Sequence, residues 1–397
     1  MRIFWIPLLL VLCLNIAIDF FIWHEMKKRG WHVLSRLHVV LAAASHVAIV
    51  GTLLVPFNNP ATTNHAMVNV MRLIWVYAML AAPKLVWAIL YAPSLALRRP
   101  QWLRRAWKGL AAAVSLIVLG LMWQGMRTTP YSHTITEVAI ASQRLPAGFD
   151  GYSIVHFSDL HLGTYDGDTA FVASCIDAIN QLHPDLIVFT GDLVSRTTSE
   201  ARPFQSALSR LQASDGVLSI MGNHDYDDYT TMTAAERQHD HDALCQLQAD
   251  CGWTVLNGSH TTLHHAGDSI VVVGTENYST GHTPNYSHLE NDLAGIDASN
   301  YIVLLQHNPN MWHDEVLNHH PEVDLMLSGH THALQMMITM GGKHYSPAQF
   351  VYPHWGGHYQ QGSQHLYVNT GLGMVGVPAR IGTKPEITLI TLKNKTP

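Results

Sequence analysis

Four apolar runs in the first third of the chain constrain its folding more than any other feature. They cover residues 3–23, 37–57, 70–91 and 110–126. Each is close to the ~20 residues that a helix needs to cross the hydrocarbon core of a membrane. A cleaved signal peptide is the alternative for the first run, but no small-residue cleavage site with a polar start follows it. We therefore predict four transmembrane helices within residues 1–127.

Basic residues between these runs predict their orientation. Lys and Arg cluster in the first connection, at residues 27–36, and in the third connection, at residues 98–108. The other side of the predicted bundle carries only Arg2, Arg72 and Arg127. Because cytoplasmic loops carry an excess of Lys and Arg, both clusters are expected in the cytoplasm. The chain after residue 127 is then expected on the periplasmic or extracellular side of the cell (inner) membrane.

Two charged residues, Asp19 and Lys84, lie inside apolar runs. An ionisable residue at membrane depth is by default a candidate functional site. The plainer interpretation is that the two side chains pair with each other, or that the long lysine reaches the membrane surface. We favour the plainer interpretation.

The charge balance changes sign along the chain. Residues 1–127 hold 13 Lys+Arg against 2 Asp+Glu, a net +11, whereas residues 128–397 hold 10 against 27, a net −17. An acidic part of this size repels phosphate backbones, so no nucleic-acid partner is expected. An excess of carboxylates suits a protein that binds cations.

Short runs rich in Val, Ile and Leu dominate the chain after residue 128 and predict buried strands, with helical stretches between the early ones. The runs are SIVHFSDLH, DLIVFTGDLV, GVLSIMGNHD, SIVVVGTE, YIVLLQHNP, DLMLSGHTH, LYVNTGLG and EITLITL. Alternation with helices predicts an α/β domain that starts with βαβ units. The later strands have fewer helices between them, so a mixed second sheet is expected.

Polar residues that can bind metals stand at the ends of five predicted strands. They are Asp159, His161, Asp192, Asn223, His224, His307, His330 and His332. Ligands gather at the carboxyl ends of strands in open α/β sheets. Positions i and i+2 of an extended chain face the same side, so each of the pairs Asp159/His161 and His330/His332 is expected to converge on one point. Glycines before Asp192, Asn223 and His330 permit tight turns and close approach.

The residue types predict which metal binds. Imidazoles mixed with carboxylates suit Mn²⁺, Fe²⁺ or Zn²⁺ better than Ca²⁺ or Mg²⁺. Even seven of these eight residues exceed the ligands that one ion needs, so two divalent ions are expected, with Asp192 as the natural bridge.

The motifs DLHLG, GDLV, GNHD, QHNP and GHTH, in this order, resemble those of the calcineurin-like metallophosphoesterases, over roughly residues 150–393. The ending LYVNTGLG, PARIG and PEITLITL resembles that of membrane-associated bacterial phosphodiesterases and of transmembrane proteins with a metallophosphoesterase domain. The resemblance implies a two-sheet αββα sandwich with a dinuclear metal centre. We accordingly expect a transmembrane region at residues 1–127, a linker at 128–149 and the metallophosphoesterase domain at 150–397.

The resemblance also implies a role for each site residue. One ion would be held by Asp159, His161, Asp192 and His332. The other would be held by Asp192, Asn223, His307 and His330. His224 would be catalytic, as the proton donor to the leaving group, rather than a ligand. Relatives often read GHTHGGQ where this chain has Ala333 and Leu334 before Gln335, which puts the shape of the substrate cleft in doubt.

The leading functional hypothesis is a membrane-anchored phosphoesterase that hydrolyses phosphodiester or phosphomonoester bonds. Its substrate would be membrane-associated or extracytoplasmic, such as a phospholipid or lipid-linked phosphate, and the lipid bilayer would be a partner. One alternative is a UDP-diacylglucosamine-type lipid pyrophosphatase, whose cytoplasmic substrate the charge pattern disfavours. The other is a non-catalytic metal-binding membrane sensor, which would have no need of His224.

Several further residues carry weaker expectations. Asp225 is expected to orient the His224 imidazole. His354 and His358 are candidates for the mouth of the cleft. Cys245 and Cys251 are close enough in sequence for a disulfide, and two free thiols are nearly as well supported.

Overall fold

The computed structural model describes residues 2–96, 100–281 and 283–395. The chain forms two compact units. The first comprises Met1–Phe57 and Asn69–Met126, and the second comprises Asn58–Val68 and Arg127–Pro397.

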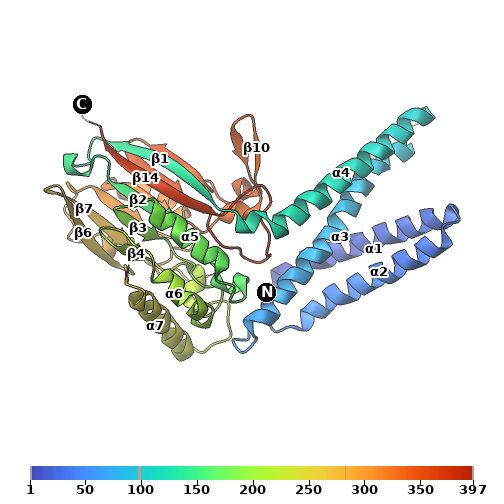
Figure 1. Ribbon diagram of the computed structural model, residues 1–397, viewed down its shortest axis with the longest axis horizontal. Coiled ribbons are helices and arrows are strands. Elements are labelled where there is room, and N and C mark those ends of the chain that lie inside the picture. The colour runs from blue at the N-terminus through green and yellow to red at the C-terminus, as the bar shows by residue number, and fades with distance from the viewer. Residues whose placement is uncertain (1, 97–99, 282, 396–397) are drawn as a thin grey trace. The chain divides into compact units, whose positions relative to one another are not determined.

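The first unit is built from four long helices (Figure 1): α1 (Arg2–Lys28), α2 (His32–Gly51), α3 (Asn64–Ala96) and α4 (Gln101–Arg127). All four are long and apolar enough to cross a membrane, so the prediction of four such helices is confirmed. Arg98 and Arg99 of the predicted cytoplasmic cluster lie outside the described residues. The orientation of the helices stays a prediction.

Asp19 and Lys84 pair with each other, which is one of the two outcomes that the favoured interpretation left open. Lys84 Nζ donates to both carboxylate oxygens of Asp19, at 2.8 and 3.0 Å. His46 Nε2 lies 3.1 Å from Asp19 Oδ2, and its Nδ1 lies 3.2 Å from the hydroxyl of Tyr77. Three helices of the first unit therefore share one polar network at membrane depth.

The first sheet of the second unit has six strands. In spatial order they are β1 (Thr134–Ser142), β14 (Glu386–Asn394), β2 (Ser153–Phe157), β3 (Leu186–Phe189), β4 (Val217–Ser219) and β5 (Trp253–Val255). Strands β2 to β5 run parallel, which confirms the expected βαβ start. Strand β14 is antiparallel to β2 and parallel to β1, so this sheet is mixed.

The second sheet also has six strands. In spatial order they are β12 (Gly357–Gln361), β13 (Gln364–Val368), β9 (Val323–Ser328), β8 (Ile302–Leu305), β7 (Asp268–Gly274) and β6 (Ser259–His265). The inner four are parallel, and β12 and β6 are antiparallel edge strands. The expected mixed sheet is confirmed, and all eight predicted runs form strands.

Apolar side chains from both sheets meet in one buried core, which explains the near-continuous apolar runs. Helices α5 (Ala170–Gln181) and α7 (Ala234–Asp250) cover the outer face of the first sheet (Figure 1). The helical segments α8 (Leu289–Asp292) and α9 (Leu317–His319) lie over the outer face of the second. The layers are therefore helix, sheet, sheet, helix, as predicted.

Six strands were not among the eight runs predicted from the sequence: β1, β5, β6, β10 (Ile338–Met340), β11 (Lys343–Tyr345) and β12. Strand β1 lies within residues 128–149, which we had expected to be a linker, and it pairs along its whole length with β14. Strands β10 and β11 form a separate two-stranded hairpin. The domain boundaries themselves stay a prediction.

Candidate metal centre

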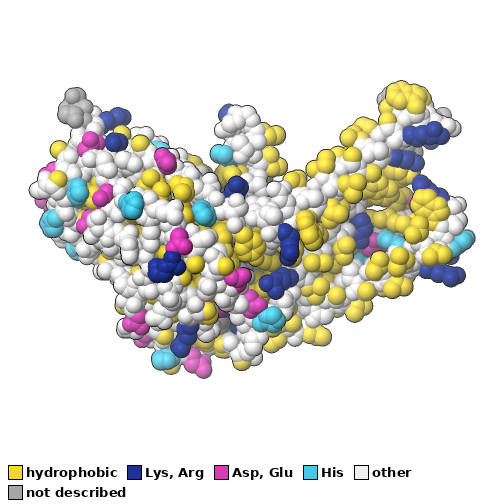
Figure 2. Space-filling model, viewed as in Figure 1, with side chains coloured by type: hydrophobic (Ala, Val, Ile, Leu, Met, Phe, Trp, Pro, Cys, Tyr) yellow, Lys and Arg dark blue, Asp and Glu magenta, His cyan; other side chains and the backbone are white. Residues whose placement is uncertain are grey.

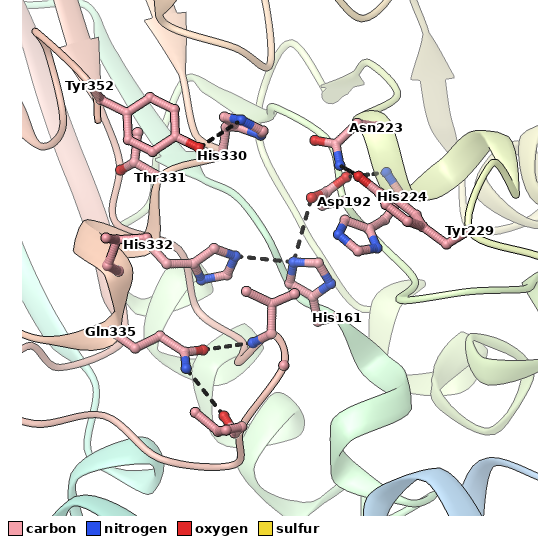
Figure 3. Close-up of a pocket in the computed structure, with 14 residues that line it drawn as sticks. His161, Asp192, Asn223, His224, Tyr229, His330, Thr331, His332, Gln335 and Tyr352 are labelled. Atoms are coloured by element: carbon pink, nitrogen blue, oxygen red, sulfur yellow. Dashed lines mark hydrogen bonds and ion pairs between the residues drawn. The ribbon is translucent and has the colours of Figure 1, made fainter. Parts of the chain in front are cut away.

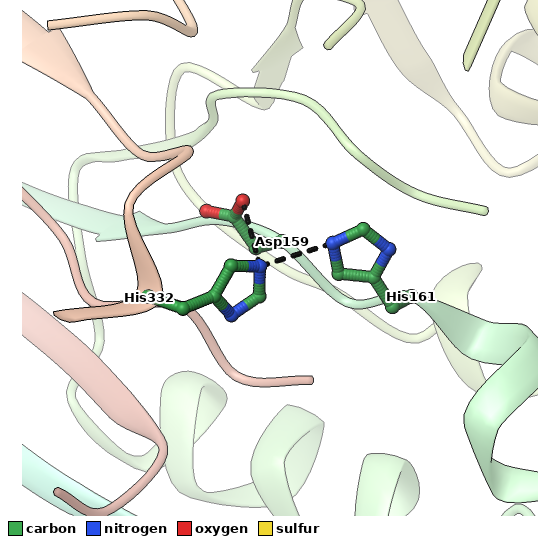
Figure 4. Close-up of side chains that lie close together, drawn as sticks. All are labelled: Asp159, His161 and His332. Atoms are coloured by element: carbon green, nitrogen blue, oxygen red, sulfur yellow. Dashed lines mark hydrogen bonds and ion pairs between the residues drawn. The ribbon is translucent and has the colours of Figure 1, made fainter. Parts of the chain in front are cut away.

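The predicted site residues gather where strands of both sheets end. Asp159 and His161 follow β2, Asp192 follows β3, and Asn223 and His224 follow β4. His307 follows β8, and His330 and His332 follow β9. Figure 3 shows six of these side chains around one pocket, and Figure 4 shows Asp159 beside His161 and His332. The two sheets thus bring together all eight residues singled out from the sequence.

The ligand atoms form three overlapping groups. Within each group, the ligand atoms lie within 4.8 Å of one another. The groups are Asp159, His161 and His332; Asp192, His307 and His330; and His161, Asp192 and His224. His161 and His332 face each other with Nε2 atoms 3.0 Å apart (Figure 4). Asp192 lies between the groups, with Oδ2 3.4 Å from His161 Nε2 and 3.2 Å from His307 Nε2. This is the place that a bridging carboxylate would need.

The backbone brings these side chains together by a different route from the one expected. Asp159, His161, Asp192, His330 and His332 all have positive φ, between 43° and 74°, so they lie in turns rather than in extended chain. As a result, His330 and His332 do not converge on one point: His332 joins the first group and His330 the second. The expectation from extended geometry was wrong for that pair. Positive φ at residues other than glycine stores strain, and such strain is typical of functional sites.

Glycines allow the close approach that the sequence predicted. A Cβ atom at Gly222 would collide with Asp192 Oδ1, and one at Gly329 would collide with Asp159 Oδ2. Gly191 also has φ +94°, which favours glycine. Alanine at any of these positions would displace a candidate ligand or its strand end.

Burial and the surrounding charges set the protonation of the cluster. Burial alone would raise the pKa values of Asp159 and Asp192, but neighbouring imidazoles outweigh it and hold both pKa values below their usual range. Burial lowers the pKa of His161 well below its usual value and that of His330 to about 3. Burial alone would also lower the pKa of His307, but Asp192 and Asp159 raise it to about 9. The carboxylates are thus ionised, and His161 and His330 are neutral, which are the forms in which these groups bind metals, whereas His307 has to release a proton to do so.

The residues present fit a dinuclear metal centre. The carboxamide oxygen of Asn223 is buried and has no hydrogen-bond partner among the described residues. Its Nδ2 donates to the hydroxyl of Tyr229 at 2.8 Å, which fixes the orientation of the amide (Figure 3). A buried oxygen left unpaired costs about 1–3 kcal/mol, so a partner for it is expected. A divalent cation suits this oxygen beside imidazoles and carboxylates.

His224 is held by Ser195 and Tyr229 rather than by Asp225, which was expected to orient it. Its Nδ1 lies 2.8 Å from the carbonyl oxygen of Ser195, and its ring stacks on Tyr229 with centroids 4.3 Å apart. Asp225 does not contact the imidazole: its carboxylate accepts the backbone N–H of Asp192 at 2.8 Å and of Val194 at 3.1 Å. The prediction that Asp225 orients His224 was wrong, because the buried carboxylate is needed to hold the turn that carries Asp192.

The expectations for the mouth of the cleft and for the two neighbouring cysteines can also be compared with the structure. His354 packs against Trp312 and His358 pairs with His365, and neither lines the pocket around the candidate ligands. Cys245 and Cys251 are both free thiols.

Sequence reasoning missed three residues that support the site: Ser195 and Tyr229, described above, and Arg380. The Arg380 guanidinium is fully buried, lies 3.2 Å from His332 Nδ1 and donates to the carbonyl oxygens of Thr370 and Gly373. The PARIG motif was the available signal for Arg380. The backbone carbonyl of Ser195 holds His224 whatever the residue type, so it gives no sequence signal. The Ser195 hydroxyl also lies 3.4 Å from His161 Nδ1.

Comparison with known proteins agrees with this geometry. A family model described as calcineurin-like phosphoesterase matches residues 152–334. The uncharacterized metallophosphoesterase YkuE of Bacillus subtilis is 36% identical over 302 residues, which are 75% of this chain and 98% of the relative. The transmembrane protein with metallophosphoesterase domain of Danio rerio is 30% identical over 268 residues, 65% of this chain and 57% of the relative. Solved structures are more distant: a dimetal phosphatase from Danio rerio has 13% identity over 56% of this chain and 88% of its own, with a TM-score of 0.34.

The fold and the donor set define a metallophosphoesterase that carries the residues for two metal ions. The chain belongs to the calcineurin-like phosphoesterase family, as its motifs predicted.

Proposed function

We propose that this protein is a membrane-anchored, dinuclear-metal hydrolase of phosphodiesters or phosphomonoesters, acting on the extracytoplasmic side. The observation that carries the proposal is the set of three overlapping ligand groups together with the unpartnered Asn223 oxygen. Asp159, His161, Asp192 and His332 would hold one ion. Asp192, Asn223, His307 and His330 would hold the other.

The metal ions would lower the pKa of a water molecule and offset negative charge on the phosphoryl oxygens. The chain's own contribution to the chemistry centres on His224. With Nδ1 bound to the Ser195 carbonyl, the ring is fixed and presents Nε2 to the pocket. Water oxygen forms a new bond to phosphorus, the bond to the leaving oxygen breaks, and His224 donates the proton that this oxygen takes up. The products are an alcohol and a phosphate with one ester bond fewer.

The four apolar helices and the basic clusters support the proposed location. A chain that is anchored in the membrane meets esters of membrane lipids at high local concentration. A UDP-diacylglucosamine-type pyrophosphatase would work from the cytoplasmic side, so the same charge pattern speaks against it.

Hydrolysis of model esters by the purified full-length chain tests the proposal. We expect Mn²⁺-dependent hydrolysis of bis-p-nitrophenyl phosphate or p-nitrophenyl phosphate, loss of that activity with EDTA, and restoration by added metal. Asp159→Asn should abolish it. Asp168→Asn is the matched control, since Asp168 only caps the backbone N–H of Ala170. Two bound ions without hydrolysis of any ester would favour the non-catalytic sensor instead.

A further inference from the structure

Exposed hydrophobic side chains of the second unit are concentrated beside the cleft. Of the ten large hydrophobic residues that are exposed within the described part of Arg127–Pro397, seven lie between positions 334 and 351. They are Leu334, Met336, Ile338, Met340, Tyr345, Phe350 and Val351. Phe350 is 84% exposed and Met340 is 61% exposed. We call these seven residues the hairpin surface. Concentrated exposure of this kind marks an interaction site.

The hairpin itself is amphipathic. Among the described residues, strands β10 and β11 pair with each other and with no other strand, and the register places Ile338 opposite Tyr345 and Thr339 opposite His344. Since side chains alternate along a strand, Ile338, Met340 and Tyr345 share one face with Lys343, which lies opposite Met340. The opposite face has Thr339 hydrogen-bonded to His344 at 2.9 Å. An isolated two-stranded hairpin is marginally stable in water, so a partner for its apolar face is expected.

The charge of this region differs from that of the rest of the unit. Residues 325–385 contain no Asp or Glu but contain Lys343, Arg380 and Lys384, whereas all 27 acidic residues after position 127 lie outside this stretch. Figure 2 shows the hairpin, labelled β10 in Figure 1, with hydrophobic side chains along one edge and no acidic group in this view. A surface of this composition is compatible with anionic lipid headgroups, which the rest of the unit would repel.

The hairpin surface continues into the candidate active site. Leu334 lines the same pocket as His330 and His332, together with Tyr352 and Val377. Leu334 has φ 46°, a left-handed conformation that costs a residue other than glycine roughly 1–2 kcal/mol. Glycine at this position would avoid the cost. The strained leucine gives this chain an apolar wall where the cleft meets the hairpin surface.

We propose that the hairpin surface inserts into the membrane leaflet that faces the second unit, and that the cleft takes its phosphoester from the headgroup of a lipid in that leaflet. This inference rests on the proposed function. The substrate class is a phosphoester whose acyl chains stay in the bilayer. Only residues 128–133 separate α4 from β1, and six residues reach at most about 21 Å, so the unit cannot leave the membrane surface. The short connection therefore keeps the second unit close to the bilayer.

Insertion is tested without reference to activity. The full-length chain in nanodiscs of phosphatidylethanolamine and phosphatidylglycerol carries an NBD fluorophore on Phe350→Cys, with Cys13 and Cys245 replaced by serine. We expect a blue-shifted emission that doxyl-labelled lipids quench. The control label at His264→Cys, on an exposed residue of the edge strand β6, should show neither effect. Water-like emission at position 350, or a blue shift that doxyl lipids do not quench, would overturn insertion. The second result would indicate cover by a protein surface.

Delivery of lipid is tested by comparing two substrates. For Ile338→Asp/Met340→Asp, we expect the ratio of nanodisc-lipid hydrolysis to bis-p-nitrophenyl phosphate hydrolysis to fall at least ~10-fold, because neither residue lines the pocket. Ile135→Asp should keep the wild-type ratio. An unchanged ratio in the hairpin variant would overturn lipid delivery, as would a wild-type enzyme that hydrolyses the soluble ester but no lipid. A wild type that hydrolyses neither ester defeats the proposed function, while the fluorescence result still decides insertion.

Discussion

His224 Nδ1 lies 2.8 Å from the backbone carbonyl oxygen of Ser195. This contact uses one ring nitrogen and turns the other toward the pocket that the candidate ligands line. A histidine anchored in this way can donate a proton without being a metal ligand, although its ring also lies within reach of Asp192 and His161. The first prediction separates these two roles.

His224→Ala should retain both metal ions and lower turnover by ~10²–10⁴, the range for a positioned general acid. The loss should be largest for an alkyl phosphodiester, whose alkoxide needs the proton, and smallest for a p-nitrophenyl ester, whose leaving group departs unaided. Metal analysis and kinetics with both esters provide the measurement. His332→Ala should instead lose metal and slow all esters alike. Metal loss in His224→Ala would make His224 a ligand.

Asp192→Asn should lose both ions, because Asp192 lies between the two groups and each would lose its shared negative charge. Metal content per chain, measured by mass spectrometry, checks this expectation. Asp168→Asn should retain the wild-type content. Two ions retained in Asp192→Asn would contradict the bridging role.

A reporter fused after Thr128 should behave as an exported protein. The reason is that the basic clusters at residues 27–36 and 98–108 are expected to stay in the cytoplasm. Alkaline phosphatase should be active at this position, and a fusion after Gly30 should give the opposite result. Fluorescent GFP after Thr128, with inactive phosphatase, would reverse the topology.

Asp19→Asn and Lys84→Met should each destabilise the protein more than the double variant does, because either change alone leaves an unpaired charge at membrane depth. We expect a coupling of roughly 1–3 kcal/mol from thermal unfolding in detergent. The exposed pair Glu25–Lys28, at 3.6 Å, is the control, with an expected coupling of at most ~0.5 kcal/mol. If the coupling energy of Asp19 and Lys84 equalled that of Glu25 and Lys28, the pair at membrane depth would have no special role in stability.

Glu200 should make stability depend on pH. Burial raises its pKa to about 7 in the folded chain, from 4.5, although Ser195 N–H donates to it at 2.7 Å. The folded state therefore holds a proton that the unfolded state releases, so stability should fall as pH rises from about 4.5 to 7, by at most ~3 kcal/mol. Glu200→Gln keeps an acceptor for Ser195 and should remove this part of the pH dependence. A variant with the wild-type melting profile across this range would show that Glu200 is already ionised in the folded protein.

The sequence by itself determined the four long apolar helices, eight of the strands and the eight candidate residues that the structure brings together. Apolar runs of membrane length and continuous buried strands are local patterns, and GDLV, GNHD and GHTH place donors directly after strands. For Asp19 and Lys84 the sequence left two outcomes, mutual pairing or a lysine that reaches the membrane surface, because a lone charge in a membrane is costly.

Tertiary structure alone decided how the site residues are distributed between the ligand groups and which other residues hold them in place. Left-handed turns, not extended strands, send His330 and His332 to different groups. Asp225 holds backbone rather than His224, and a backbone carbonyl of Ser195 takes the role expected of a carboxylate. Such contacts depend on φ angles and on segments that lie far apart in the chain, and neither is encoded in a short motif. The hairpin surface emerged in the same way, because only the fold shows which apolar residues remain uncovered.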